Sequence, residues 1–116
     1  LPILCATPAH WTKAAESDAT VDYVNLKTIV KQGDYRRVWT LQDFKQRDGQ
    51  GILSVRRLLE FDCQKRQYLV VWLVGHSGKM AGGRELGSGN NPNPSWTSIS
   101  KRSAVEASLQ MVCAAA

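Results

Sequence analysis

The sequence lacks any long apolar run, and it has little cysteine and histidine. Its longest apolar stretch, residues 68–74, is seven residues long, whereas a membrane-spanning helix needs about 18 or more. The three cysteines include no Cys-x-x-Cys pair and the two histidines stand alone, so we expect no metal site. With 43% hydrophobic and 22% charged residues, the composition is that of a folded chain and not of a disordered one.

A catalytic motif is also missing. Residues 75–80 (GHSGKM) differ from a phosphate loop, because two residues instead of four separate the glycines and Met80 follows the lysine. We interpret them as a turn carrying a solvated histidine, His76. Glu60 and Asp62 are expected on a solvated strand face. Because no set of nucleophile, base and orienting group is discernible, we predict no cofactor and no enzymatic activity.

Basic residues exceed acidic ones, 15 to 10, for a formal charge of +5. Opposite charges are interleaved, so the excess is either dispersed solubilising charge or a patch for an acidic partner. No RNA-binding signature or zinc finger favours specific nucleic-acid binding. A patch is expected beside the glycine-rich stretch 75–94 and on an open sheet face where neighbouring strands bring two arginines together. The candidate ligand-binding residues are Arg36, Arg56, Lys79 and Arg84.

The first nine residues have the pattern of the end of a secretory signal. An apolar stretch precedes small residues, with Thr7 and Ala9 at the −3 and −1 positions of a cleavage site before His10. An ordinary N-terminal arm or strand is the alternative. We therefore expect residues 1–9 to be a signal-peptide remnant or an arm, and residues 10–116 to form one domain.

Hydrophobic patterning predicts mainly short strands. Within residues 53–63 apolar and polar side chains alternate, as in a half-buried antiparallel strand. Arg57 interrupts the apolar face, and we expect it near a sheet edge or paired with an acid. Strands are expected at residues 11–15, 20–24, 35–45, 53–63 and 67–74, with a helical turn at 25–30, a loop at 75–94 that holds a short strand around 79–86, and core tryptophans at positions 39, 72 and 96.

A helix is predicted at the C-terminal end. Ser103 with Glu106 three residues later forms a capping box, and the spacing of Leu109 and Cys113 places both on one apolar face. Cys63 lies on the apolar face of strand 53–63, so the two sulfurs meet if the helix packs there. Cleavage before His10 would remove Cys5 and leave two cysteines, Cys63 and Cys113. An even number of cysteines in a secreted chain favours a disulfide, and two buried free thiols are the alternative.

The order of these landmarks resembles the surface-adhesin protein E-like family of small exported bacterial proteins, over residues 11–113. The resemblance implies an α+β fold: an antiparallel, meander-like sheet of about five to six strands with a C-terminal helix packed on one face. It is carried by Trp11, Val21-Asp22-Tyr23-Val24-Asn25, Trp39, Ser54, Asp62-Cys63, His76-Ser77-Gly78, Trp96, Ser103 and Cys113.

The resemblance also implies a function. The family's namesake is an outer-membrane lipoprotein that binds host vitronectin and laminin and can dimerise. We therefore expect an exported binding protein, in the periplasm or at the cell surface, for a host matrix glycoprotein or another acidic glycoprotein. The alternative is an envelope accessory protein with a structural or assembly role. Strand 67–74, apolar on both faces, is expected to be covered centrally or at a homodimer interface.

Overall fold

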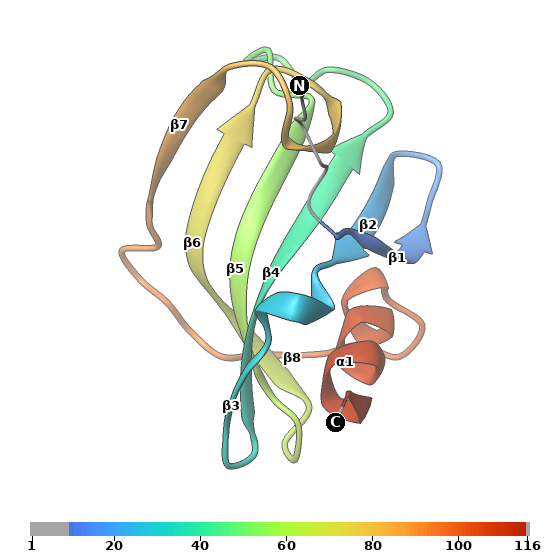
Figure 1. Cartoon of the computed structure of the whole chain (residues 1–116), viewed down its shortest axis with the longest axis vertical. Coiled ribbons are helices and arrows are strands. Elements are labelled where there is room, and N and C mark those ends of the chain that lie inside the picture. Colours follow the sequence, from blue (N-terminus) through green and yellow to red (C-terminus); the bar gives the residue numbers. More distant parts are fainter. Residues whose placement is uncertain (1–9, 116) are drawn as a thin grey trace, which may run out of the picture.

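The computed structural model describes residues 10–115 (Figure 1). The expectations for residues 1–9, with Cys5, lie outside this range. Within it the chain forms eight strands, two 3-10 turns and one α-helix. They are β1 (Thr12–Glu16), β2 (Thr20–Val24), η1 (Leu26–Thr28), β3 (Val30–Gln32), β4 (Tyr35–Phe44), β5 (Ser54–Asp62), β6 (Gln67–His76), η2 (Lys79–Ala81), β7 (Glu85–Asn90), β8 (Thr97–Ser98) and α1 (Ala104–Ala114).

All strand pairs are antiparallel, and the main order across the sheet is β1-β2-β4-β5-β6-β7. The short strands β3 and β8 pair with the beginnings of β4 and β6. Thus β2 and β3 share one edge of β4, and β7 and β8 share one edge of β6. The predicted α+β meander is confirmed. The strand count is higher than predicted, because two positions in the sheet are each filled by two short segments.

The additional strands are ones that hydrophobic patterning does not reveal. All three residues of β3 are exposed, so they carry no alternation to detect. Gly33, at φ 61°, makes the tight connection from β3 to β4. The short strand expected around residues 79–86 begins later, as β7. Its sequence ELGSGN is polar and glycine-rich, and it is held by backbone pairing with β6.

The hydrophobic core lies between the sheet and α1. Val38 and Leu59 are paired on β4 and β5, and they pack in one cluster with Leu109 and Val112 of the helix, all at most 2% exposed. A disulfide joins Cys63, just after β5, to Cys113 of α1, with the two Cα atoms 5.8 Å apart. The predicted disulfide is therefore confirmed, and it ties the last turn of the helix to the sheet.

The predicted cap of α1 is present, with one difference in its hydrogen bonds. Ser103 Oγ accepts a hydrogen bond from the backbone N–H of Glu106 at 3.1 Å. The Glu106 carboxylate reaches back one residue further than in a standard capping box and accepts from the backbone N–H of Arg102 at 2.7 Å. The same carboxylate pairs with Arg66 in the turn between β5 and β6. The helix start is thus attached to the sheet by charge as well as by packing.

Arg57 lies on the α1 side of β5, an inner strand of the sheet, so the expectation of an edge position is wrong. Its Nε atom is buried and has no hydrogen-bond partner among the described residues. Burial lowers the pKa of this guanidinium, and the charge of Asp22 opposes that effect. Tyr68 opposes the effect of burial on this pKa as well.

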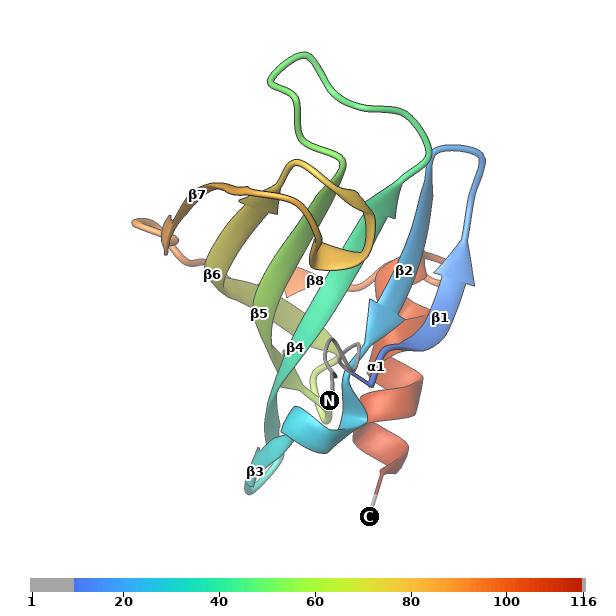
Figure 2. The same cartoon turned by 45° about the horizontal axis from the view of Figure 1, so that its top comes forward.

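The opposite face of the sheet carries a second set of inward-pointing side chains. Strand alternation puts Trp39 and Leu41 of β4 on this face, across from Leu58 and Arg56 of β5. Figure 2 shows the segment between β6 and β7 (yellow to orange) in front of the sheet and α1 behind it. We call this side of the sheet, opposite α1, the η2 face.

Strand β6 is an inner strand, with β5 on one side and β7 and β8 on the other. Its apolar sequence is therefore explained in part by its place in the sheet, although Leu73 keeps 42% of its surface exposed. The homodimer interface proposed for this strand remains a prediction.

Candidate ligand-binding site

A cavity of about 440 Å³ opens on the η2 face. We call it the Arg56 cavity, after the arginine in its wall. Its lining combines aromatic and apolar groups with a few polar groups, which is typical of sites for small ligands. It is lined by Trp11, Asn25, Thr28, Trp39, Arg56, His76, Met80 and Ala81.

Arg56 is held on two sides. Its guanidinium carbon lies 5.4 Å from the ring centroid of Trp39, within the range of a cation–π interaction. Its Nε–H donates a hydrogen bond to His76 Nε2 at 2.9 Å. The two Nη groups have no hydrogen-bond partner among residues 10–115. Within residues 10–115, the guanidinium is thus fixed in orientation while its terminal donors are left without a partner.

His76 occupies the last position of β6 and is only 5% exposed, so the expected solvated loop histidine is wrong. Burial lowers the pKa of its imidazole, the charge of Arg56 lowers it further, and Glu85 on β7 opposes the shift. The ring is therefore neutral at pH 7. Because Nε2 accepts from Arg56, we infer that the proton resides on Nδ1.

The turn η2 forms the rim of the cavity in a strained backbone conformation. Met80 and Ala81, both without the freedom of glycine, have φ values of 55° and 61°. The Asp43 carboxylate accepts a hydrogen bond from Met80 N at 2.8 Å, and Ser54 Oγ accepts one from Ala81 N at 2.9 Å. Consecutive left-handed residues held by side-chain anchors are found most often at functional sites.

The opposite wall positions Trp39. Asn25 caps η1 by accepting from the backbone N–H of Lys27, and Thr28 Oγ donates to the Asn25 carbonyl at 2.7 Å. The same hydroxyl accepts from the backbone N–H of Trp39 at 3.0 Å. The indole that faces Arg56 is therefore set by a network of local hydrogen bonds, and the expectation that Trp39 is simply a core residue is wrong. Trp96 is also not a core residue, since it is 40% exposed.

The four basic residues predicted as a ligand site are only partly brought together. Arg36 pairs with Phe61, and Arg56 pairs with Leu41. Positions 56 and 61 are an odd number of residues apart on one strand, so their side chains point to opposite faces. The expectation that Arg36 and Arg56 share a basic face is therefore wrong. The Arg36 guanidinium instead donates to the carbonyls of Gly33 and Tyr35.

Lys79 and Arg84 both belong to the segment that covers the η2 face. Lys79 is exposed, donates to the carbonyl of Phe44 at 2.9 Å and lies 3.8 Å from an Asp43 carboxylate oxygen. Arg84 is also exposed, and its backbone N–H donates to Ser77 Oγ. Three of the four candidates are thus associated with the η2 face. Sequence reasoning missed the contributions of His76 and Trp11, for which only tertiary contacts give a signal.

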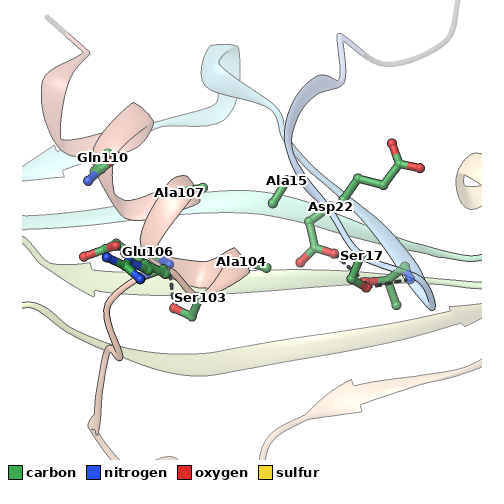
Figure 3. Close-up of a pocket in the computed structure, with 11 residues that line it drawn as sticks. Ala15, Ser17, Asp22, Ser103, Ala104, Glu106, Ala107 and Gln110 are labelled. Atoms are coloured by element: carbon green, nitrogen blue, oxygen red, sulfur yellow. Dashed lines mark hydrogen bonds between the residues drawn. The ribbon is translucent and has the colours of Figure 1, made fainter.

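A second cavity of about 370 Å³ lies between the β1–β2 hairpin and the start of α1 (Figure 3). Several of its polar groups already form hydrogen bonds within the fold. Asp22 accepts a hydrogen bond from Thr20 Oγ at 3.0 Å, and both Ser103 and Glu106 cap the helix. Small side chains such as Ala107 line much of the rest. This cavity is therefore a weaker candidate than the Arg56 cavity.

Residues 10–115 show neither a metal site nor a membrane-spanning helix. No three histidine, cysteine or acidic side chains gather there in a group that could hold a metal ion. Neither does any helix in this part of the chain have the length and apolarity needed to cross a membrane.

The fold is that of a small α+β domain with a helix on one face of its sheet and a cavity on the other. The family model described as surface-adhesin protein E matches residues 11–114. The chain therefore belongs to the surface-adhesin protein E family, as its landmark residues indicated.

Solved structures share the fold at low sequence identity. Crystal form II of Haemophilus influenzae protein E has a TM-score of 0.68 and 10% identity, covering 87% of this chain and 91% of that one. A structure of protein E from non-typeable Haemophilus influenzae has a TM-score of 0.64 and 10% identity, covering 97% and 80%. No curated protein matches this chain. At this identity the likeness concerns the fold alone.

Proposed function

We propose that the protein is an exported, non-enzymatic binding protein that recognises an acidic group of a host matrix glycoprotein. Vitronectin and laminin are the partners to test first. Family membership supports a surface adhesin as the class of protein. The observation that carries the proposal is Arg56, which lines the cavity and whose guanidinium is held by Trp39 and His76.

The surroundings of Arg56 support an acidic partner. Lys79 and Arg84 are exposed on the segment that covers the same face, and the chain has a net charge of +5. Positive potential of this kind speeds the encounter with an anionic surface, whereas the fixed guanidinium provides a directional contact. The two effects are separable, because long-range attraction is screened by salt and a close, partly buried contact is screened much less.

The test is binding of the oxidised protein to immobilised vitronectin and laminin, at low salt and at physiological salt. We expect saturable binding to one of them at physiological salt, weakened at least tenfold by Arg56→Gln. Arg37→Gln is the matched control, since it removes the same charge from an exposed position of β4 that pairs with Glu60 at 3.5 Å.

Two outcomes would contradict the proposal. Binding that fades with salt and falls equally in both variants would show only nonspecific attraction by a basic protein. Absence of binding to any matrix glycoprotein would favour the alternative of an envelope accessory protein. We also propose that the protein dimerises through the apolar strand β6. Sedimentation of the same samples measures this.

A further inference from the structure

We propose that the Arg56 cavity binds an organic carboxylate whose apolar part lies against Trp11 and Trp39. The inference rests on the proposed binding function of this cavity, but it is independent of which macromolecule, if any, carries the carboxylate. It names the chemical group that Arg56 recognises and the kind of group attached to it.

The part of the cavity wall that the structure describes offers hydrogen-bond donors. Arg56 provides two Nη groups that are without partners among the described residues. No aspartate or glutamate of residues 10–115 lines the cavity. The oxygen acceptors in the wall are already engaged, since Asn25 Oδ1 and Thr28 Oγ both accept backbone N–H groups. A ligand that presents acceptors and a negative charge therefore fits, and a cation does not.

The number of charges favours a carboxylate over a phosphate. Among the described residues, Arg56 is the only cationic side chain that lines the cavity, and a planar guanidinium matches the two oxygens of a carboxylate in a bidentate pair. A phosphate monoester carries nearly two negative charges at pH 7. It would leave one of them without a partner in a partly enclosed site, where an uncompensated charge is costly.

The remainder of the lining fits an apolar substituent. Trp11 and Trp39 contribute indole rings, and Met80 and Ala81 contribute aliphatic surface from the opposite rim. Trp39 is already fixed by its contact with Arg56 and by the hydrogen bond from its backbone N–H to Thr28. A preformed wall of this kind reduces the entropy lost on binding. The volume of about 440 Å³ is at the lower end of the range for small-ligand pockets, so it fits one ring or a short alkyl chain.

The test uses three probes of equal ring size: phenylacetate, its neutral amide phenylacetamide, and phenyl phosphate. Binding to the oxidised chain is measured by calorimetry at pH 7 and physiological salt, with tryptophan fluorescence as a second readout. We expect phenylacetate to bind at least tenfold more tightly than either other probe. Arg56→Gln should abolish this preference and Arg37→Gln should leave it unchanged.

Two further variants keep the test informative if Arg56→Gln fails to fold. Arg56→Lys retains the charge but loses bidentate pairing, so it should weaken phenylacetate binding several-fold. Trp11→Ala removes part of the apolar wall near the beginning of the domain, and it should weaken binding of phenylacetate and phenylacetamide by the same factor.

Equal binding of acid and amide, or tighter binding of phenyl phosphate, would overturn the inference. If vitronectin or laminin binds but phenylacetate neither binds nor competes, the proposed function stands and this inference fails. If phenylacetate binds through Arg56 and no matrix glycoprotein does, the inference stands and the choice of partner fails.

Discussion

The Cys63–Cys113 disulfide should provide a large share of the stability of this domain. The bridge links residues 50 positions apart, between the end of β5 and the end of α1. In the chain-entropy model a loop of this length stabilises the folded state by about 4 kcal/mol, because the crosslink removes conformations from the unfolded chain. Domains of this size have a net stability of only about 5–15 kcal/mol. Reduction of the disulfide is therefore expected to remove a substantial part of the free energy of unfolding.

The prediction is tested by reducing the disulfide of the wild-type protein, which leaves the side chains of Cys63 and Cys113 in place. Urea unfolding followed by tryptophan fluorescence would compare the oxidised and reduced forms. For a urea m-value of about 1.5–2 kcal/mol/M, a loss of about 4 kcal/mol lowers the midpoint by about 2–3 M. The C63A/C113A variant is the control, since its midpoint should not respond to reductant.

A midpoint that falls by less than about 0.5 M on reduction would refute this reasoning. It would mean that the unfolded chain keeps the ends of the loop together without the bridge, or that the crosslinked native state is strained enough to cancel the gain. Far-ultraviolet circular dichroism of the reduced form measures whether the helical content of α1 is kept. We expect α1 to remain docked, because Leu109 and Val112 are buried independently of the bridge.

Three further predictions concern packing, backbone conformation and pH. Leu109→Ala should destabilise the protein by about 2–5 kcal/mol in urea unfolding, since it empties a site in the core that is 2% exposed, and a loss under 1 kcal/mol would contradict the described packing of α1. Gly83→Ala should lower the free energy of unfolding by at least about 1 kcal/mol and weaken ligand binding. The reason is that Gly83 has φ +67° and an added Cβ would lie 2.3 Å from Ser77 Oγ and 2.7 Å from Gly78 N. Gly87→Ala, with open space around it, is the control. Burial and Arg56 lower the pKa of His76 in the folded state, so the unfolded chain binds more protons than the folded one just below pH 6.5. The free energy of unfolding should therefore fall as the pH drops from 7 to 5. A His76→Gln variant with an equally steep decline would contradict this assignment.

Much of the fold could be predicted because its signals are local. The alternation along β5, the cap at Ser103 and the apolar spacing of α1 each depend on residues within one element, and all three are present. The short strands were predictable only in part. Strand β3 lacks apolar residues that point inward. Strand β7 is held by backbone pairing with β6, and such pairing does not require a periodic pattern of apolar side chains.

The candidate site could be predicted less well, because its members come from distant parts of the chain. Charge and position in the sequence indicate Arg56 and Lys79 as candidates. The glycine-rich stretch after His76 favours a solvated side chain, yet folding of that stretch over the sheet buries it. Arg36 and Arg56 are both basic residues on strands, and only the register of β4 against β5 shows that they lie on opposite faces.

The α+β class, the capped C-terminal helix and the two cysteines that could meet across the core follow from the amino-acid sequence, because periodicity and capping are properties of neighbouring residues. Which face each strand presents, and where the cavity forms, depend on the tertiary structure. Pairing of β5 with β4 and β6 places Arg56 against Trp39 and His76. The physical reason is that side chains alternate with a period of two along a strand. A shift of one residue in register would therefore move Arg56 to the other face and separate it from Trp39 and His76.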